Sequence, residues 1–204
     1  MESNHPLVKD LVNHLRDISI DAKRFRELAS QIAQLLVYEA LQNAELTTRT
    51  IDTWIGKREF GFLDQEHFIF VAILRAGLPM QEGAMALFPR SQAGFLAMKR
   101  DEKTFEPILY YERVPDLRGK RVFICDPMVA TGGSLSDAVS QIKTHTPAAI
   151  TTLNIIAAPE GVEHVRKNHT DITLHIAQID EGLDERKFII PGLGDAGDRA
   201  FNTL

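Results

Sequence analysis

Short apolar segments that alternate with stretches of helical periodicity constrain the fold of this chain more than any other feature. The segments FIFVAIL, VFIC and LNIIAA are almost continuously apolar. A strand with one face in water would instead alternate apolar and polar residues, so these strands are expected to be buried on both faces. Such strands occur in sheets covered by helices on both sides. The sequence therefore predicts an α/β fold with a mostly parallel, twisted sheet and helices on both faces.

The remaining elements follow from periodicity and caps. The first 46 residues are predicted to form two helices, the second beginning near Asp21, which suits an N-cap. Residues 47–55 favour strand and predict a hairpin arm that carries Trp54. Nothing in the sequence separates two domains, so residues 1–204 are expected to form a single domain. Further strands are expected at 67–74, 94–98, 108–113, 121–125, 150–157 and 172–177, and helices at 78–87, 135–143 and 161–168.

Composition argues against several classes of protein. A net charge of −5 does not suit binding of nucleic acid or of an acidic membrane surface by the whole protein. The sequence contains neither an apolar run long enough to span a bilayer nor a signal-peptide core. Cys125 is the single cysteine, so it forms no internal disulfide and indicates a reducing compartment. We therefore expect a cytoplasmic protein that binds neither nucleic acid nor membrane.

The segment 121–134 carries the strongest functional signal. An apolar strand ends in Asp126, and the turn ATGGS at 130–134 then opens a helix. Ligands of parallel α/β sheets bind at the carboxyl ends of the strands. A carboxylate there accepts hydrogen bonds from hydroxyls, and the amides of the turn, with the helix dipole, hold an anion. The pattern predicts a sugar-phosphate site; the alternative is a plain turn in which Thr131 and Ser134 only cap the helix.

Three other segments are candidates for the same site. Arg75 follows a strand beside Ala76 and Gly77 and suits a phosphate or diphosphate, although a surface arginine at a strand end is an equal alternative. Arg100 lies in a mixed-charge segment that is more often a solvated loop. The glycine-rich stretch 188–199 offers backbone donors and acceptors to a flat heterocycle, unless it is a flexible tail. The seven histidines are dispersed and suggest no metal cluster.

With these motifs identified, the chain resembles the uracil phosphoribosyltransferase family over nearly its whole length. The resemblance rests on HPLVKDLVNHLRD, KRFRELASQIAQLLVYEAL, ILRAGL, CDPMVATGGS, AAPEGV and FIIPGLGDAGDR. It implies the phosphoribosyltransferase fold, with N-terminal helices, a β-arm and a C-terminal hood that binds the base. It also implies the salvage reaction in which uracil and 5-phospho-α-D-ribose 1-diphosphate (PRPP) give UMP and diphosphate, with Mg²⁺ required.

The resemblance also assigns roles to residues. Arg75, Asp126 and Asp195 would be catalytic, and the base would contact Ile189, Gly194, Asp195 and Ala196. Pro127 stands where many phosphoribosyltransferases have a second acid, so Mg²⁺ would be held mainly through PRPP and water. Phe188 replaces the usual tyrosine of the family. The residues implied for PRPP are Arg75, Arg100, Asp126, Pro127, Met128, Val129, Ala130, Thr131, Gly132, Gly133, Ser134 and Asp195.

The resemblance further implies a homodimer or larger homo-oligomer and, as in part of the family, activation by GTP. Two alternatives remain open. A PRPP-binding regulator of transcription or RNA on the same fold would need a basic surface, which the net charge of −5 does not favour. Transfer to another base, such as hypoxanthine or orotate, is disfavoured by the segment IIPGLGDAGD. Uridine kinase chemistry is set aside because the sequence has no P-loop.

Overall fold

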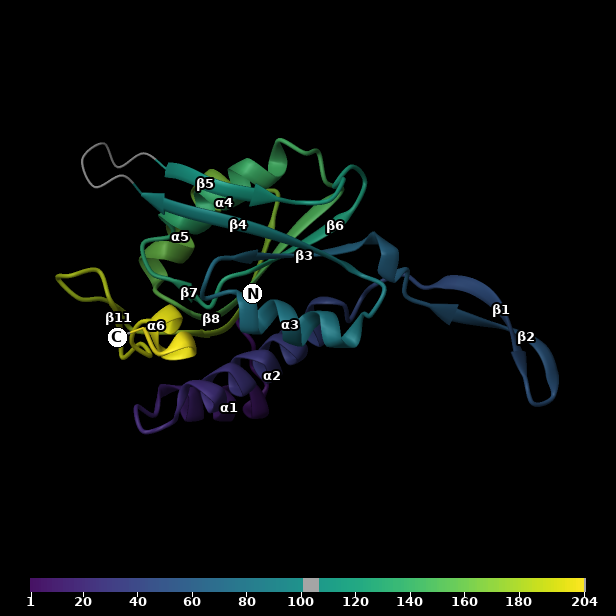
Figure 1. Ribbon diagram of the computed structural model, residues 1–204, viewed down its shortest axis with the longest axis horizontal. Coiled ribbons are helices and arrows are strands. Elements are labelled where there is room, and N and C mark those ends of the chain that lie inside the picture. Colours follow the sequence, from purple (N-terminus) through teal and green to yellow (C-terminus); the bar gives the residue numbers. More distant parts are fainter. Residues whose placement is uncertain (101–106, 204) are drawn as a thin grey trace.

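The computed structural model describes residues 1–100 and 107–203; the side chains of Lys99, Arg100 and Pro107 lie outside this description. A seven-stranded sheet forms its centre (Figure 1). Its order is β5-β4-β3-β6-β8, with β7 and β9 both paired to β8. Among the described strand pairs of this sheet, only β4–β5 is antiparallel. The strands are β3 (Phe68–Ile73), β4 (Gln92–Arg100), β5 (Pro107–Arg113), β6 (Arg121–Cys125), β7 (Met128–Val129), β8 (Ala149–Ala157) and β9 (Thr173–Ile179).

Both faces of the sheet are buried, as the apolar segments predicted. In β3, Phe68 and Phe70 belong to one hydrophobic cluster, and Ile69 and Val71 belong to another. This alternation follows because successive side chains of a strand point to opposite faces. The first cluster lies under α1 (Pro6–Arg16), α2 (Ala22–Ala40) and α3 (Leu78–Leu87), and the second under α4 (Gly133–Lys143) and α5 (Pro159–Asn168). The predicted α/β architecture is confirmed.

The N-terminal helices begin at side-chain caps. Asp21 accepts a hydrogen bond from the Arg24 amide at 2.7 Å and starts α2, as expected. The His5 ring accepts from the Leu7 amide at 3.2 Å and starts α1. The chain ahead of α1 runs beside β9, where the Ser3 amide donates to the Ile176 carbonyl at 2.8 Å. The first helices are thereby held against the sheet. None of the described helices is long and apolar enough to span a bilayer.

Two smaller hairpins extend from this body. β1 (Thr47–Thr53) and β2 (Gly56–Phe62) form an antiparallel arm that projects away from the sheet, with Trp54 96% exposed in its turn (Figure 1). The expected hairpin is thus confirmed. At the other end, β10 (Gly182–Leu183) pairs with β11 (Ile189–Ile190), and α6 (Ala196–Phe201) follows. We call residues 180–203 the hood.

The hood is an ordered unit and not a flexible tail. Ile189, Leu193 and Ala196 are each at most 5% exposed and pack into the cluster under α1 and α2. The guanidinium of Arg26 in α2 donates to the Ala200 carbonyl at 2.6 Å. Burial of these apolar side chains offsets the entropy of ordering the glycine-rich segment.

Candidate functional site

The carboxyl ends of the parallel strands bring the predicted segments to one edge of the sheet. Arg75 lies two residues beyond β3, Asp126 directly follows β6, and Asp180 directly follows β9. Arg100 is the last residue of β4, and its side chain lies outside the described part of the structure. Parallel topology places these ends side by side although they are far apart in sequence. The hood covers this same edge (Figure 1).

A small cavity lies between the end of β6 and the start of α4. Its volume is about 90 Å³. The first amides of a helix have no carbonyl ahead of them, so α4 presents donors and its positive dipole end to this space. Eight of the nine lining residues belong to the predicted phosphoribosyl-diphosphate set; Leu135 is the addition. The lining residues are Asp126, Met128, Val129, Ala130, Thr131, Gly132, Gly133, Ser134 and Leu135.

Pro127, which belongs to the predicted set, has a different place. It is buried, and its carbonyl accepts hydrogen bonds from the amides of Ile155 and Ile156 at 3.1 and 3.0 Å. These bonds attach the loop to β8, so β7 can pair beside it. Pro127 therefore lies under the cavity wall and is not among its lining residues in the described chain.

Close packing explains two glycines of the cavity wall. Gly132 caps α4 with φ of +79°, and a Cβ there would lie 2.5 Å from the Gly161 carbonyl oxygen. A Cβ on Gly161 would lie 2.3 Å from the Ala130 carbonyl oxygen. The start of α5 thus packs tightly against the loop at 130–134, and only glycine fits on both sides. The packing role of Gly161 was not predicted from the sequence.

Asp126 is held by a network from β8. Its amide donates to the Leu153 carbonyl at 3.2 Å, and its carbonyl accepts from the Asn154 side chain at 2.7 Å. Thr152 donates to Asn154 at 2.7 Å, and both side chains are buried. Polar residues in an otherwise apolar strand could have indicated this network from the sequence, because a buried amide side chain needs hydrogen-bond partners.

The Asp126 carboxyl is half-buried, and one of its oxygens accepts from the Met128 amide at 3.4 Å. Burial raises the pKa of Asp126 to about 7, and the Met128 amide acts in the opposite direction. The group therefore changes charge near neutral pH. The neighbouring Cys125 is free and fully buried, and burial raises the pKa of its thiol. As expected, Cys125 is a structural thiol.

Arg75 bridges the sheet edge to the hood. Its guanidinium lies 3.2 Å from an Asp198 carboxylate oxygen and 3.1 Å from the Thr203 hydroxyl, with 54% of the side chain exposed. Nearby, a Cβ on Gly77 would lie 2.1 Å from the Cys125 carbonyl oxygen, so the Arg75 loop packs directly on the end of β6. The structure thus brings Arg75 beside the Asp126 loop. Asp198 and Thr203 were not predicted from the sequence.

The predicted base-contact residues lie together in the hood. Asp195 caps α6 by accepting from the Asp198 amide at 2.9 Å, and Gly194 precedes it with φ of +78°. Both are exposed, whereas Ile189 and Ala196 are buried. A Cβ on Gly197 would lie 3.3 Å from an Asp195 carboxylate oxygen and 3.9 Å from an Arg75 guanidinium nitrogen. Arg75 and Asp195 therefore face the same space.

Phe188 begins this segment and is 52% exposed, while its amide donates to the Asp184 carboxylate at 2.8 Å. The aromatic ring thus remains at the surface of the hood.

In the described chain no group of three or more His, Cys, Asp or Glu side chains could hold a metal ion. A carboxylate-rich metal cage is therefore not part of the described edge.

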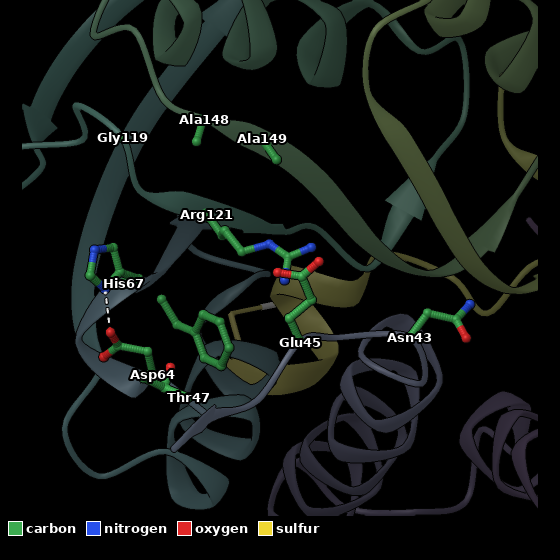
Figure 2. Close-up of a pocket in the computed structure, with 10 residues that line it drawn as sticks. Asn43, Glu45, Thr47, Asp64, His67, Gly119, Arg121, Ala148 and Ala149 are labelled. Atoms are coloured by element: carbon green, nitrogen blue, oxygen red, sulfur yellow. Dashed lines mark ion pairs between the residues drawn. The ribbon is translucent and has the colours of Figure 1, made fainter. Parts of the chain in front are cut away.

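A larger cavity, of about 550 Å³, lies at the opposite edge of the sheet (Figure 2). Phe68, Arg121 and Ala149, the first residues of β3, β6 and β8, line it. Figure 2 shows Arg121 and Glu45 pointing toward one another, while His67 pairs with Asp64 at 3.0 Å. The larger cavity contains none of the residues predicted for the site, and ligands of parallel sheets bind at the carboxyl ends of the strands. We therefore place the site at the smaller cavity.

Comparison with solved structures agrees with the α/β fold described above. A solved protein from Aquifex aeolicus superposes with a TM-score of 0.95 at 41% identity, covering 100% of this chain and 98% of the other. A hypoxanthine-guanine phosphoribosyltransferase from Bacillus anthracis superposes with a TM-score of 0.53 at 13% identity, covering 78% of this chain and 80% of the other. The second likeness shows the shared fold alone.

Sequence comparison identifies the family. Residues 2–203 match the family model described as uracil phosphoribosyltransferase. The uracil phosphoribosyltransferase of Aquifex aeolicus is 42% identical over 201 residues, which cover 98% of this chain and 97% of that protein. The enzyme of the same description from Thermus thermophilus is 43% identical with the same coverage. The chain therefore belongs to the uracil phosphoribosyltransferase family.

Proposed function

We propose that the edge formed by the Asp126 loop, Arg75 and the hood carries out the family's reaction, transfer of the phosphoribosyl group of PRPP to N1 of uracil. Family membership makes the chain a pentosyltransferase of pyrimidine salvage. The observation that carries the site assignment is the cavity of about 90 Å³, with a carboxylate at one end and the first turn of α4 at the other. That arrangement suits a ribose hydroxyl pair joined to a 5′-phosphate.

Binding of PRPP follows from this geometry. The amides and hydroxyls at 130–134 would surround the 5′-phosphate, and the ionised Asp126 carboxylate would accept hydrogen bonds from the ribose hydroxyls. Asn154 fixes the Asp126 backbone, so the carboxylate is oriented before the substrate arrives. Arg75, half-exposed beside this loop, would contact the diphosphate.

Catalysis then depends on charge that develops as the bond to diphosphate breaks. Negative charge grows on the leaving group, and positive charge grows on the sugar. Arg75 stabilises the negative charge on the leaving group, and Arg100 would add to this stabilisation. Only stabilisation that is stronger in the transition state than in the ground state accelerates the reaction. The backbone at Ile189, Gly194 and Ala196 would place uracil N1 behind the reacting carbon.

Mg²⁺ fits the donor set of this edge when PRPP carries it. Asp126 is the carboxylate that lines the cavity, and Pro127 occupies the position of a second acid. Magnesium in phosphate sites commonly uses one or two carboxylates together with substrate phosphates and water. When bound, the ion neutralises charge on the diphosphate. The chain itself contributes the Arg75 guanidinium to the same end, whereas the Asp126 carboxylate would bind the ribose hydroxyls.

The pKa of Asp126 predicts a pH dependence of PRPP binding. Burial raises this pKa to about 7. Because the carboxylate and not the carboxylic acid accepts from the ribose hydroxyls, PRPP affinity should rise as pH increases through 7 and level off above it. Calorimetric titration with PRPP and Mg²⁺ from pH 5.5 to 8.5 measures this.

Asp126→Asn provides the comparison for that experiment, since the phosphates of PRPP titrate identically with both proteins. The variant should bind about tenfold or more weakly at pH 8, because a hydrogen bond to a charged acceptor contributes about 1.5–3 kcal/mol. Its pH dependence should retain only the contribution of PRPP. Identical curves for wild type and variant would remove Asp126 from the ribose site.

Asp195 is proposed to accept the N1 proton of uracil. Asp195→Asn keeps a side chain able to cap α6 but removes the negative charge. Loss of a general base should lower kcat about 10²-fold and change the shape of the pH–rate profile. Steady-state rates at saturating PRPP across pH measure it. A reduced rate with an unchanged profile would contradict the base role and leave Asp195 as a binding residue.

Base specificity tests the function directly. The protein is mixed with PRPP, Mg²⁺ and, separately, uracil, hypoxanthine, orotate or cytosine, and nucleotide and diphosphate are quantified. We expect UMP from uracil alone. Turnover with another base would reassign the hood, and PRPP binding without turnover, joined to salt-sensitive RNA binding, would favour the regulator.

We further propose that the chain works in the cytoplasm as a homodimer or larger homo-oligomer, and that GTP activates it. The exposed arm and its Trp54 support assembly into an oligomer, since large exposed aromatic side chains commonly mark contact surfaces. Sedimentation measures the assembly, and addition of GTP to the uracil assay measures the activation. A monomer, or an unchanged rate, would contradict the respective proposal.

A further inference from the structure

A buried ion pair lies beneath the loop assigned to the base. The side chain of Asp180 is 0% exposed and that of Arg16 is 16% exposed. The two guanidinium nitrogens of Arg16 donate to the two carboxylate oxygens of Asp180 at 2.9 and 2.5 Å. This is the two-pronged geometry in which arginine and carboxylate bind most strongly and with a defined orientation.

Both backbone groups of Gly192 bind this pair. The Gly192 amide donates to Asp180 at 3.1 Å, and the Gly192 carbonyl accepts from Arg16. Gly192 has φ of +65°, and a Cβ there would lie 2.2 Å from the Ile189 carbonyl oxygen. The chain therefore turns tightly at Gly192 and brings Ile189 against it. Whatever holds Gly192 also sets the position of the Ile189 backbone.

The pair connects this turn to the frame of the protein. Arg16 is the last residue of α1, and Asp180 directly follows β9, where its amide donates to the Ala157 carbonyl at the end of β8 at 2.8 Å. Arg199 holds the next residue from the other side, donating to the Leu193 carbonyl at 2.8 Å. The loop is thus anchored to the same sheet edge that carries Asp126.

We infer that Arg16 and Asp180 are positioning residues for the acceptor base. Neither is among the proposed base contacts; they hold Gly192, and through it the backbone that would bind uracil. The inference rests on the proposed assignment of residues 189–196 to the base. Displacement of reacting groups by about 1 Å can cost about 10²-fold in rate. A rigid connection between the hood and the Asp126 edge is therefore expected to appear in the use of uracil.

The test compares variants that keep or remove this connection. Arg16→Met/Asp180→Leu removes both charges together, so no unpaired charge remains buried. We expect its KM for uracil to rise about tenfold or more and its kcat to fall, with PRPP affinity within about twofold of wild type. Arg16→Lys keeps the positive charge but cannot make the two parallel hydrogen bonds of arginine. Its KM for uracil should therefore lie between those of wild type and the double variant.

Arg26→Met is the matched control. Arg26 also links an N-terminal helix to the hood through a carbonyl, but at Ala200 in α6, outside the base loop. It should leave the KM for uracil unchanged. Hydrogen exchange without substrates supplies a second readout: the Gly192 amide should exchange faster in the double variant than in wild type or Arg26→Met.

Three outcomes would overturn the inference: a normal KM for uracil in the folded double variant, equal losses for uracil and PRPP, or the same change in KM with Arg26→Met. Thermal unfolding establishes that each variant is folded. Failure of the proposed function is a separate result, because it would appear as absence of UMP formation by the wild-type protein. In that case the exchange rate of the Gly192 amide still tests whether the pair anchors the turn.

Discussion

Gly132→Val is expected to abolish PRPP binding. A Cβ at this position would lie 2.5 Å from the Gly161 carbonyl oxygen and 3.0 Å from a Val165 methyl carbon, and φ is +79°. The backbone must therefore move, and the amides at the start of α4 lose their common direction. Each hydrogen bond to a charged acceptor contributes about 1.5–3 kcal/mol, so loss of two or three should weaken PRPP binding at least about 10²-fold. Calorimetric titration with PRPP and Mg²⁺ measures the loss.

Gly119→Val is the matched control for backbone strain. Gly119 has φ of +70°, but a Cβ there meets nothing within 4 Å, and it lies at the opposite edge of the sheet. Both variants should lose about 1–2 kcal/mol of stability because a branched residue enters the left-handed region. Gly132→Val should lose more than this, because its Cβ also meets the Gly161 carbonyl oxygen. PRPP affinity should change in Gly132→Val alone. Normal affinity in that variant would show that the phosphate does not bind at the start of α4.

Arg75→Gln is expected to lower kcat about 10²–10³-fold, the range found when one preorganised donor to a developing anion is removed. The glutamine can still reach toward Thr203 but carries no charge to the leaving diphosphate. Since the loss concerns charge that grows in the transition state, kcat should fall more than PRPP affinity. Steady-state kinetics with both substrates varied, together with direct PRPP titration, separates the two effects.

Two controls accompany Arg75→Gln. Arg90→Gln changes an arginine of similar exposure, 51% against 54%, whose guanidinium lies 3.8 Å from Glu66 at the other edge of the sheet. It should leave catalysis unchanged. Asp198→Asn removes the carboxylate that pairs with Arg75 at 3.2 Å and should leave Arg75 charged and available to diphosphate. If Asp198→Asn were as damaging as Arg75→Gln, the contact between Arg75 and the hood, and not stabilisation of the diphosphate by Arg75, would explain both losses.

The order and type of the elements could be predicted because their signals are local. Burial of β3 on both faces can be predicted from its run of apolar residues, and the N-cap of α2 can be predicted from Asp21. The boundaries were less accurate. α4 begins at Gly133 and not at Leu135, and β4 begins at Gln92 and not at Gly94, because pairing with neighbouring strands and packing on α5 extend these elements.

The candidate site could be predicted in part. The cavity between Asp126 and α4 was legible because a strand, an acid and a small turn are contiguous in sequence. Asn154 and Asp180 were not identified, since a polar residue inside or after an apolar strand has no visible partner until the chain is folded. The links from Arg75 to Asp198 and from Arg16 to Asp180 join residues more than 120 positions apart.

By itself, the sequence determined the α/β class and the family to which the chain belongs, and it predicted the turn at 130–134 and the glycine-rich segment of the hood as binding segments. Each of these depends on residues that are neighbours along the chain, where periodicity and local geometry act. Only the tertiary structure decided that Gly161 closes the wall behind Gly132, that Asp198 holds Arg75 and that a buried ion pair anchors Gly192. These depend on burial and close contact between distant segments, which local patterns do not encode.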